Sequence, residues 1–522
     1  MVKVITAAEL SKHTTKESCW MAIHGKVYDL TAFIHEHPGG SAILLRHSGR
    51  DSTKEFEKFH SEDMIERVLP NSAIVGDFEE PATVTASEPP PVDDTPEMVS
   101  LIDEEPKNAT LDMMLNAMDF KAVAEGKVSR EGWAYLYSAA GDEFSYQENE
   151  DAFARISLIP RVLVDVSKVD CSANILGRHC DVPFYITAVA MAKLYDRDGE
   201  KCMARGVSKT KACGIDMPYM VPTLASCSLR EIVAACEPSL DKWYQLYVNP
   251  SFSVVESMIT KIIDNGFSAL FITVDAPELG MREKDMRFKA RESAAVQGGA
   301  KRETAGVAQA ITSFITHSLS WKNLPDITNL AKKKAAERAT DAVRAYRERH
   351  RLGLRGIVVS NHGARQVDTV KSGVQMLYEC TRALKKFVLG NEVHNLKNRV
   401  YEAERTKLAL LVSSAKIASF VGWKGRSDAQ FSVFVDGGVR RGTDILKCIA
   451  LGASAVGIGR PFMTAMAAFR EDGVVKLANL FKEEILVNMR LLGCQNLDEV
   501  DEELLDARAM DYPPPGQVRA RY

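Results

Sequence analysis

The stretch GIVVSNHGARQVD, residues 356–368, places two side chains that could do chemistry three residues apart. An apolar, β-branched run ends at Ser360 and Asn361, and His362 and Arg365 follow on either side of a glycine. A histidine can accept a proton near neutral pH, and an arginine can hold a carboxylate through two parallel hydrogen bonds. The plainer interpretation is a strand that ends in a polar loop. We favour a catalytic base beside an anion clamp, at the carboxyl end of a barrel strand.

Two further histidines stand near the N-terminus. His37 precedes a Pro-Gly-Gly turn, and His60 follows the helical stretch DSTKEFEKF. Two neutral imidazoles from opposite walls of an apolar crevice are the arrangement that a six-coordinate haem iron needs. A His-Pro-Gly-Gly sequence alone is as often a simple turn, but GKVYDLTAFI before it and His60 after it favour a haem site. Over about residues 4–78 the segment resembles the cytochrome b5 domain, which implies that His37 and His60 are the axial ligands of a b-type haem.

Two glycine-rich strand ends lie close together in the C-terminal third of the chain. VFVDGGVRR contains Gly438 and Arg440, and GIGRP contains Gly459 and Arg460. Glycines let backbone N–H groups approach an anion closely, and the arginines add positive charge. This pattern is typical of the phosphate site that the loops after the last two strands of a (β/α)8 barrel form.

Strands and helices alternate around these motifs. Short β-branched runs such as FYITAVAM, ALFITVDAP, GIVVSNHG, SVFVDGG and AVGIGRP are separated by amphipathic helical stretches. Such alternation predicts a parallel α/β architecture, here a (β/α)8 TIM barrel with insertions. We expect the barrel to span residues 108–505, after a small α+β domain at 1–78 and an acidic, proline-rich linker at 79–107. The tail, residues 506–522, is expected to be mobile.

Composition limits the possible partners. The chain has 522 residues, of which 46% are hydrophobic and 26% charged, as in an ordinary globular protein. Its formal net charge of -4 gives no reason to expect nucleic acid as a partner. The ten cysteines show no CxxC spacing, which favours reduced thiols. We expect no membrane span, because no run of about 18 apolar residues occurs, and we recognise no secretory or Arg-rich leader.

The predicted barrel resembles the FMN-dependent 2-hydroxy-acid oxidase and dehydrogenase family, and SNHGARQVD is the most specific part of the likeness. Together with the haem domain, the chain is similar to the yeast-type flavocytochrome branch of that family. The resemblance implies FMN and haem b as cofactors and a small 2-hydroxy acid, with L-lactate favoured, as the substrate. It also implies cytochrome c as the electron acceptor and a homotetramer. The compartment would be the cytoplasm or the mitochondrial intermembrane space.

The resemblance also implies a role for individual residues. His362 would take a proton from the substrate, with Asp275 hydrogen-bonded behind it. The remaining catalytic positions would be Arg365 and Arg282 for the carboxylate, with Tyr135, and Tyr247 on the hydroxyl side. The isoalloxazine would be held by Ala188, Val189, Ala190, Gln245 and Thr273, and the ribityl phosphate by Asp436, Gly438, Arg440, Gly459 and Arg460. On its own, Tyr135 is more simply a packing aromatic, and Arg282 part of a solvated charge run. Ala190 and Leu224 would face the substrate side chain and favour a small group.

The sequence departs from the family pattern in three places. Between SWK and SNHG we find no apolar strand ending in Ile-Lys-Gly, whose lysine the family places at the flavin; residues 332–334 are interpreted as a solvated helical face. For residues 388–430 two interpretations stay open, a surface insertion and an error in the coding sequence, and the same error could account for the missing strand. Pro222 and Val189 replace a serine and a threonine, which removes two hydroxyl groups. We therefore expect an unclosed barrel with impaired activity, and two alternatives stay open: a haem-binding electron carrier on an inactive barrel, and an oxygen-using 2-hydroxy-acid oxidase.

Overall fold

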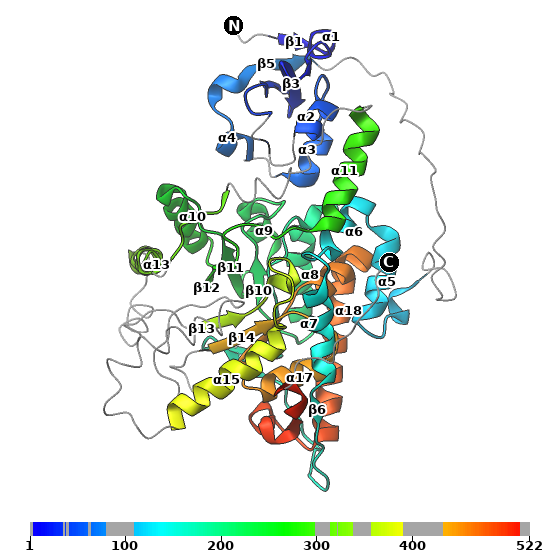
Figure 1. The fold of residues 1–522 in the computed structure, drawn as a ribbon, viewed down its shortest axis with the longest axis vertical. Coiled ribbons are helices and arrows are strands. Elements are labelled where there is room, and N and C mark those ends of the chain that lie inside the picture. Colours follow the sequence, from blue (N-terminus) through cyan, green and yellow to red (C-terminus); the bar gives the residue numbers. More distant parts are fainter. Residues whose placement is uncertain are drawn as a thin grey trace. The chain divides into compact units, whose positions relative to one another are not determined.

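The computed structural model describes residues 4–34, 37, 41–60, 64–79, 109–297, 314–320, 322–337, 356–389 and 432–511. The chain divides into two compact units, Met1–Met113 with Lys289–Ala310, and Met114–Phe288 with Ile311–Tyr522. Each unit has its own sheet and its own buried core (Figure 1).

The N-terminal unit contains a five-stranded sheet in the order β1-β5-β4-β3-β2, in which only β1 and β5 are parallel. Its strands are β1 (Val4–Thr6), β2 (Thr14–Thr15), β3 (Ser18–Ile23), β4 (Lys26–Asp29) and β5 (Ile74–Glu79). Its helices are α1 (Ala7–Leu10), α2 (Ser41–His47), α3 (Thr53–Phe59) and α4 (Met64–Val68). β3 and β4 join through His24 and Gly25, both with positive φ, as a tight hairpin turn requires.

Alternate residues of β3 supply two apolar clusters on opposite faces of this sheet. Met21 and Ile23 pack with the cluster that contains Leu30, Ile34, Leu44 and Ile65, whereas Ala22 packs with Ile5, Leu10 and Val27. The period of two is that of a strand buried on both sides. The first cluster lies on the side of α2 and α3, and it provides the apolar surroundings that a haem needs.

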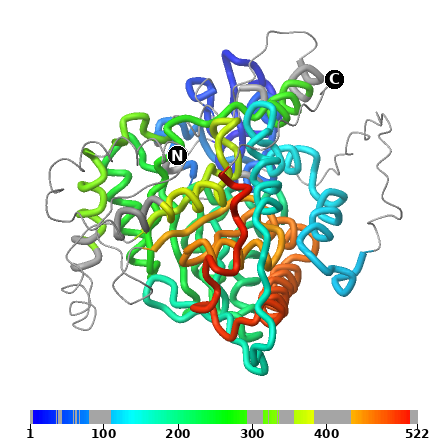
Figure 2. Tube along the Cα trace, turned by 60° about the horizontal axis from the view of Figure 1, so that its bottom comes forward, coloured from blue at the N-terminus to red at the C-terminus, as the bar shows by residue number. Residues whose placement is uncertain are grey.

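The second unit is built on a parallel sheet in the order β12-β11-β10-β9-β15-β14-β13. The strands are β9 (Phe184–Ile186), β10 (Tyr219–Val221), β11 (Lys242–Leu246), β12 (Ala269–Ile272), β13 (Gly356–Val359), β14 (Ser432–Asp436) and β15 (Ala455–Ile458). β15 pairs with β9 (Val456 opposite Phe184), so the strand of this sheet that comes last in the chain lies beside the strand that comes first. The orange segments beside the green ones in Figure 2 show this joining. The sheet is that of an α/β barrel, as predicted.

Helices surround the sheet, in the order expected for βα repeats. The repeat helices are α8 (Glu200–Ala212), α9 (Leu229–Ala235), α10 (Phe252–Asp264), α13 (Leu324–Glu337), α15 (Gly373–Leu389), α17 (Gly442–Ala450) and α18 (Arg460–Leu492). α11 (Glu283–Gln297) follows β12 in the chain, and its residues from Lys289 on belong to the N-terminal unit. Before the barrel come α5 (Ala117–Lys127), α6 (Arg130–Tyr137) and α7 (Phe144–Ala154). Two short antiparallel pairs lie outside this sheet: the hairpin of β7 (Ala173–Ile175) and β8 (Arg178–Cys180), and the pair of β6 (Ser157–Leu158) with β16 (Leu505–Asp506).

Aromatic side chains fill the interior of the barrel. Trp243 stacks on Phe271 with ring centres 5.1 Å apart and lies 5.0 Å from Tyr185. Phe434 completes the group. A Cβ on Gly457 would lie 2.8 Å from the Tyr185 hydroxyl, so the glycine of β15 makes room for this ring. This packed layer fills the interior of the barrel, so a ligand is expected at the carboxyl ends of the strands.

The described sheet has seven strands, and β12 and β13 are its two end strands. In the described part of the chain between them we find helices α11 and α13 but no strand; residues 338–355 lie outside the description. All four residues of β12 are partly exposed, whereas all five of β11 are buried. On α13 the Lys334 ammonium pairs with Glu256 at 3.1 Å, as a partly solvated helical face would. The side chains of residues 332 and 333 are not described, and residues 390–431 are not described either.

The C-terminal segment corrects one prediction. Residues 506–522 were expected to be mobile, but β16 pairs with β6, and Met510 is buried. Asp511 accepts hydrogen bonds from Arg382 (2.7 Å) and Tyr378 (3.1 Å). The prediction was wrong as far as Asp511, because a single buried methionine and two side-chain bonds fix a stretch whose local sequence has no periodicity. Residues 512–522 lie outside the description.

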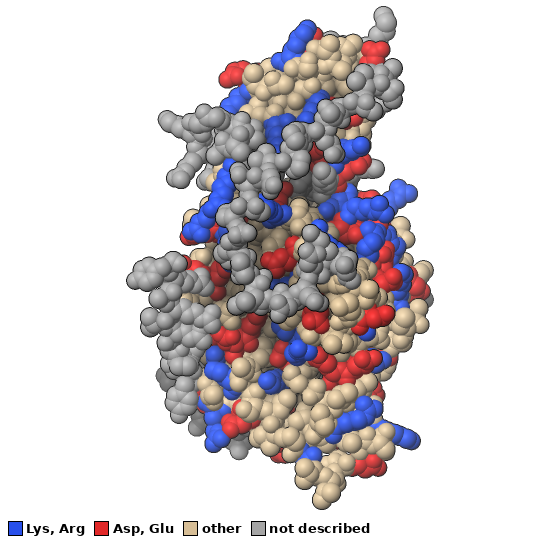
Figure 3. Space-filling model, turned by 90° about the vertical axis from the view of Figure 1, so that its right-hand side faces the viewer, with Lys and Arg blue, Asp and Glu red and all other residues tan. Residues whose placement is uncertain are grey.

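The surface agrees with the low net charge. On the face that Figure 3 shows, acidic and basic side chains are mixed over the described residues. Within the part of the chain that the structure describes, no helix is both long enough and apolar enough to cross a bilayer.

Candidate active site

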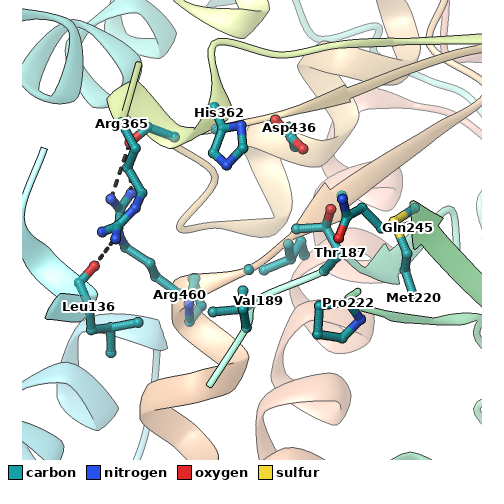
Figure 4. Close-up of a pocket in the computed structure, with 18 of the residues that line it drawn as sticks. Leu136, Thr187, Val189, Met220, Pro222, Gln245, His362, Arg365, Asp436 and Arg460 are labelled. Carbon is teal, nitrogen blue, oxygen red and sulfur yellow. Dashed lines mark hydrogen bonds between the residues drawn. The ribbon is translucent and has the colours of Figure 1, made fainter. Parts of the chain in front are cut away.

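One cavity lies at the carboxyl ends of the barrel strands (Figure 4). All predicted cofactor-binding residues line it: Ala188, Val189, Ala190, Gln245, Thr273, Asp436, Gly438, Arg440, Gly459 and Arg460. So do the predicted catalytic residues Tyr135, Tyr247, Arg282, His362 and Arg365. Asp275 is the exception, because it lies behind His362 and does not form part of the wall. The strand ends gather residues that are widely separated in sequence, as they do in other barrels.

The chain turns in the left-handed region directly after β13. His362, Gly363 and Ala364 have φ values of 59°, 62° and 63°. Two side chains fix this turn: Ser360 Oγ accepts from the His362 backbone N–H at 2.9 Å, and Asn361 Oδ1 accepts from the Ala364 backbone N–H at 3.0 Å. Non-glycine residues rarely adopt this conformation, and such strain is concentrated at functional sites. Here the turn directs the imidazole into the cavity.

The imidazole of His362 has one partner on each side. Its Nδ1 lies 3.3 Å from Asp275 Oδ1, just after β12, and its Nε2 lies 3.3 Å from the Tyr247 hydroxyl, just after β11. Burial, and then the negative charge of Asp275, raise the pKa of Tyr247, so the phenol keeps its proton. Asp275 favours the tautomer with a proton on Nδ1, which leaves Nε2 to accept a proton from a substrate.

Two guanidinium groups face the same cavity, and that of Arg282 is buried whereas that of Arg365 is half-buried. Arg282 is only 6% exposed, and burial, together with the charge of Arg365, lowers its pKa to about 10. Arg365 donates through Nη1 to the backbone oxygens of Tyr135 (2.6 Å) and Ser138 (2.9 Å), and its guanidinium lies 4.8 Å from the centre of the Tyr135 ring. Among the described residues, no carboxylate forms an ion pair with either arginine. Two cations without a paired anion among the described residues, one buried and one half-buried, form a site for a carboxylate.

This geometry decides between the two interpretations of Arg282 and Tyr135. Arg282 does not lie on a solvated face, although it stands in the charged run REKDMR, because the chain turns inward after β12. Tyr135 packs on Arg365, but it also lines the cavity. Their roles toward a substrate remain predictions.

The two glycine-rich loops lie at another side of the cavity. Gly437 and Gly438 have φ values of 100° and 80°, which side chains rarely permit. Arg440 pairs with Glu150 at 2.5 Å; burial alone would lower the pKa of Arg440, but Glu150 raises it above the ordinary value. α18 begins at Arg460 with Pro461 in its first turn. The positive end of a helix dipole, next to arginines, suits a phosphate.

Arg460 lies between the two glycine-rich loops and the left-handed turn at residues 362–364, which we call the catalytic turn. Its Nε donates to the Leu136 oxygen at 2.8 Å, and its Nη1 and Nη2 donate to the Gly363 oxygen at 3.1 Å (Figure 4). Burial, and then the charge of Arg365, lower its pKa to about 10. The guanidinium therefore supports the turn that carries His362 and adds positive charge to the cavity.

The residues of the cavity fit FMN. Oδ1 of Asp436 is buried and has no hydrogen-bond partner among the described residues, so a ligand hydroxyl could donate to it. Val189, Pro222 and Met220 give the cavity an apolar side that suits a flat ring (Figure 4). Gln245 and Thr273 hydrogen-bond each other at 2.8 Å, which fixes the orientation of the amide. The apolar wall suits the flavin ring, and the unpaired Asp436 oxygen suits the hydroxyl groups of the ribityl chain. The cationic loops suit the phosphate.

The N-terminal unit fits a haem, as the spacing and the surroundings of His37 and His60 show. The ring centres of His37 and His60 lie 6.1 Å apart. An iron between them, at about 2 Å from each coordinating nitrogen, sets the ring centres about 6 Å apart. Phe33 and Phe56 lie beside the two rings, next to the apolar cluster that contains Leu30 and Leu44. Val27 packs in the cluster on the opposite face of the sheet.

Family comparisons agree with both fits. The family described as FMN-dependent dehydrogenase matches residues 124–394 and 402–507, and the cytochrome b5-like heme/steroid binding domain matches residues 6–79. The chain belongs to the FMN-dependent dehydrogenases, with a cytochrome b5-like domain in front. The FMN-dependent dehydrogenase match includes most of residues 388–430, so our interpretation of that whole segment as an insertion is not supported.

Relatives with both domains cover nearly all of the chain. The L-lactate dehydrogenase (cytochrome) of Wickerhamomyces anomalus is 37% identical over 516 residues, which is 97% of this chain and 80% of the relative. That of Saccharomyces cerevisiae is 36% identical over 517 residues, or 96% and 79%. Glycolate oxidase 3 of Arabidopsis thaliana, another FMN-dependent dehydrogenase relative, is 32% identical over 395 residues, or 74% and 94%.

Solved structures lead to the same family. A double mutant of flavocytochrome b2 with pyruvate bound has a TM-score of 0.60 and 35% identity, covering 78% of this chain and 90% of that chain. A single mutant of flavocytochrome b2 with benzoylformate has a TM-score of 0.61 and 34% identity, covering 79% and 92%. Both cofactors that the sequence predicted, FMN and haem, are therefore those of this FMN-dependent dehydrogenase.

Some residues of the site could not be found from the sequence. Leu136, Tyr195 and Leu279 line the cavity without belonging to a motif. Asn149, on α7, exchanges two hydrogen bonds with Asn361 at the start of the catalytic turn. Since 212 residues separate these two asparagines, no local pattern connects them.

Proposed function

We propose that the protein oxidises a small L-2-hydroxy acid, with L-lactate favoured, to the 2-oxo acid. The electrons leave through the b-type haem domain to cytochrome c. The observation that carries the proposal is the placement of His362, with Asp275 behind it, in one cavity with Arg282 and Arg365. The names of the two-domain relatives, L-lactate dehydrogenase (cytochrome), support the choice of substrate and acceptor.

The chemistry follows from the charges around the cavity. Arg365 and Arg282 bind the carboxylate of the substrate, assisted by the hydroxyl of Tyr135. This fixes the 2-hydroxyl and its carbon near His362 and Tyr247, so that Nε2 of His362 can take a proton from the substrate. Asp275 stabilises the imidazolium that results. When bound, FMN supplies the acceptor for the two electrons that leave the substrate carbon.

The cavity favours a short substrate side chain. Ala190 and Leu224 both line it, and they leave space for a small group. Hydrophobic walls discriminate weakly, because one methylene changes the free energy of the transition state by about 1–3 kcal/mol. We therefore expect L-lactate to give a higher kcat/KM than glycolate or 2-hydroxybutyrate, with all three oxidised.

A steady-state assay tests the proposal and separates it from its alternatives. Purified full-length protein with FMN and haem bound is supplied with each 2-hydroxy acid, and cytochrome c reduction and oxygen consumption are recorded in parallel. L-lactate-dependent reduction of cytochrome c supports the proposal. Oxygen consumption without cytochrome c reduction would establish the oxidase, and a haem-loaded protein that reduces neither acceptor would establish the inactive barrel.

The assembly and the compartment belong to the same proposal. We propose a homotetramer that acts where cytochrome c is available, in the mitochondrial intermembrane space, with the cytoplasm as the alternative. The resemblance to the flavocytochrome branch supports this. Light scattering on the purified protein measures the assembly, and fractionation of cells tests the compartment.

A further inference from the structure

Helix α7 lies against both functional loops of the barrel, and Asn149 is the residue in contact with both. Its side chain is only 2% exposed. Asn149 Nδ2 donates to Asn361 Oδ1 at 3.0 Å, and Asn361 Nδ2 donates back to Asn149 Oδ1 at 2.8 Å. Both bonds are buried, so water does not compete for them and each amide depends on the other.

Asn361 connects Asn149 to the catalytic turn through hydrogen bonds of its side-chain amide. The oxygen that receives the bond from Asn149 also accepts from the backbone N–H of Ala364 at 3.0 Å. Asn361 Nδ2 donates to the Lys371 oxygen at 3.3 Å as well. His362 and Ala364 hold left-handed backbone conformations that persist only where the surroundings fix them. The orientation of the Asn361 amide is therefore one of the supports for the turn that carries His362 and Arg365.

The backbone of Asn149 lies against the glycine-rich loop after β14. A Cβ on Gly438 would lie 1.7 Å from the Asn149 oxygen, and one on Gly437 would lie 3.3 Å from Asn149 Nδ2. The next residue on α7, Glu150, pairs with Arg440 of the same loop. At the start of α7, Asp368 accepts from the backbone N–H of Ser145 at 2.8 Å. α7 is thus joined to the chain on both sides of His362, to Asn361 through Asn149 and to Asp368 through Ser145.

We propose that Asn149 is a positioning residue for the oxidation, an inference that rests on the proposed function. It does not touch the substrate. Its amide holds the Asn361 amide in one orientation, and through it the left-handed turn keeps His362 and Arg365 directed at the substrate. Small displacements of reacting groups lower rates steeply, so loss of this bond should affect the chemical step and the binding of a carboxylate.

Asn149→Asp tests the proposal with a change of one atom. The carboxylate still accepts from Asn361 Nδ2, but at pH 8 it presents an oxygen to Asn361 Oδ1 where the amide presented a donor. We expect the rate of flavin reduction by L-lactate in the holoenzyme to fall about tenfold to a hundredfold at pH 8. Burial favours the protonated carboxyl, which restores the donor. The rate relative to wild type should therefore recover as the pH falls to 5.

Two further variants separate positioning from simple packing. Asn149→Leu has a similar volume but no donor at any pH, so its rate relative to wild type should stay low at both pH 5 and pH 8. Gln147→Glu makes the same amide-to-carboxyl change two residues earlier on α7, where the side chain donates a hydrogen bond to Asp151. It should keep the wild-type rate at both pH values.

Binding of oxalate, followed by the change in the flavin spectrum, gives a readout that does not need turnover. The dissociation constant should rise in Asn149→Asp at pH 8 and return at pH 5. If the wild-type holoenzyme binds oxalate but oxidises no 2-hydroxy acid, the proposed function fails, while this readout still tests the role of Asn149. If Asn149→Asp does not fold, Asn361→Asp removes the returning bond of the same pair and should give the same loss. Wild-type rates and oxalate affinity in the aspartate variant, or equal losses at both pH values in the aspartate and leucine variants, would overturn the inference.

Discussion

Nδ1 of His362 lies 3.3 Å from Oδ1 of Asp275, although 87 residues separate them in the chain. The contact joins the ends of β12 and β13, the two end strands of the described sheet. It leaves the opposite nitrogen of the ring facing the cavity, next to Tyr247. The protein can therefore present a proton acceptor at a fixed point even though no strand between β12 and β13 is described.

Replacement of His362, the proposed proton acceptor, should slow oxidation of the substrate strongly while FMN and haem stay bound. In His362→Gln we expect the rate of flavin reduction by L-lactate to fall about 10²–10⁴-fold, since a positioned acid–base group contributes that much. FMN and haem contents should stay at wild-type levels, because neither cofactor depends on this ring. Anaerobic stopped-flow absorbance measures the rate. A variant that keeps a tenth or more of the wild-type rate would contradict the assignment.

Arg282→Lys should make substrate binding depend on pH. Burial and the charge of Arg365 lower the pKa of Arg282, and the same surroundings must lower that of a lysine below its usual value of about 10.4. Below that lowered pKa the ammonium is charged and binds the carboxylate; above it, the amine is neutral and binding weakens. KM for L-lactate should therefore rise with pH between 7 and 9.5 in the variant and stay level in wild type. Parallel KM profiles would show that Arg282 does not bind the substrate.

Loss of a haem ligand should block the reduction of cytochrome c but not the reduction of the flavin by L-lactate. In His60→Ala we expect the b-type haem bands and the reduction of cytochrome c to be lost, while L-lactate still reduces the flavin. His24→Asn is a matched control, because His24 is partly exposed, pairs with Glu57, and has a φ of 50° that asparagine tolerates. Absorption spectra and both rates check this. Haem bands of wild-type intensity in His60→Ala would exclude that histidine as a ligand.

Gly438→Ala should weaken FMN binding. Its φ of 80° disfavours a side chain by about 1–2 kcal/mol, and the new Cβ would meet the Asn149 backbone oxygen. Gly452→Ala has the same backbone strain, at φ 101°, but meets only Thr381 at 3.4 Å. We expect both to lower the melting temperature and only Gly438→Ala to release FMN on dilution, as flavin fluorescence would show. Equal FMN retention would mean that the loop does not hold the phosphate.

The sequence predicted those parts of the site whose signals are local. His362 and Arg365 follow a recognisable strand, and the glycines of the two loops stand where positive φ or close approach is needed. The barrel itself follows from the βα alternation. These features depend on a few consecutive residues, which is why they can be recognised without a structure.

Other features depend on contacts that no local pattern encodes. The bond between Asn149 and Asn361 spans 212 residues. The sequence next to each asparagine looks like that of an ordinary helix or loop and does not mark the residue. Arg282 stands in a charged run that is typical of a solvated face, yet the turn after β12 buries it. Met510 fixes part of a tail that has no periodicity. Tertiary packing decided each of these, and it is not visible in the residues alone.

The account is tested most directly by mixing full-length protein, loaded with FMN and haem, with L-lactate in the absence of oxygen and recording both absorption spectra with time. We expect the flavin band to bleach and the reduced haem bands to follow, with no change on addition of D-lactate. A flavin that stays oxidised with L-lactate, while both cofactors are bound, would contradict the account.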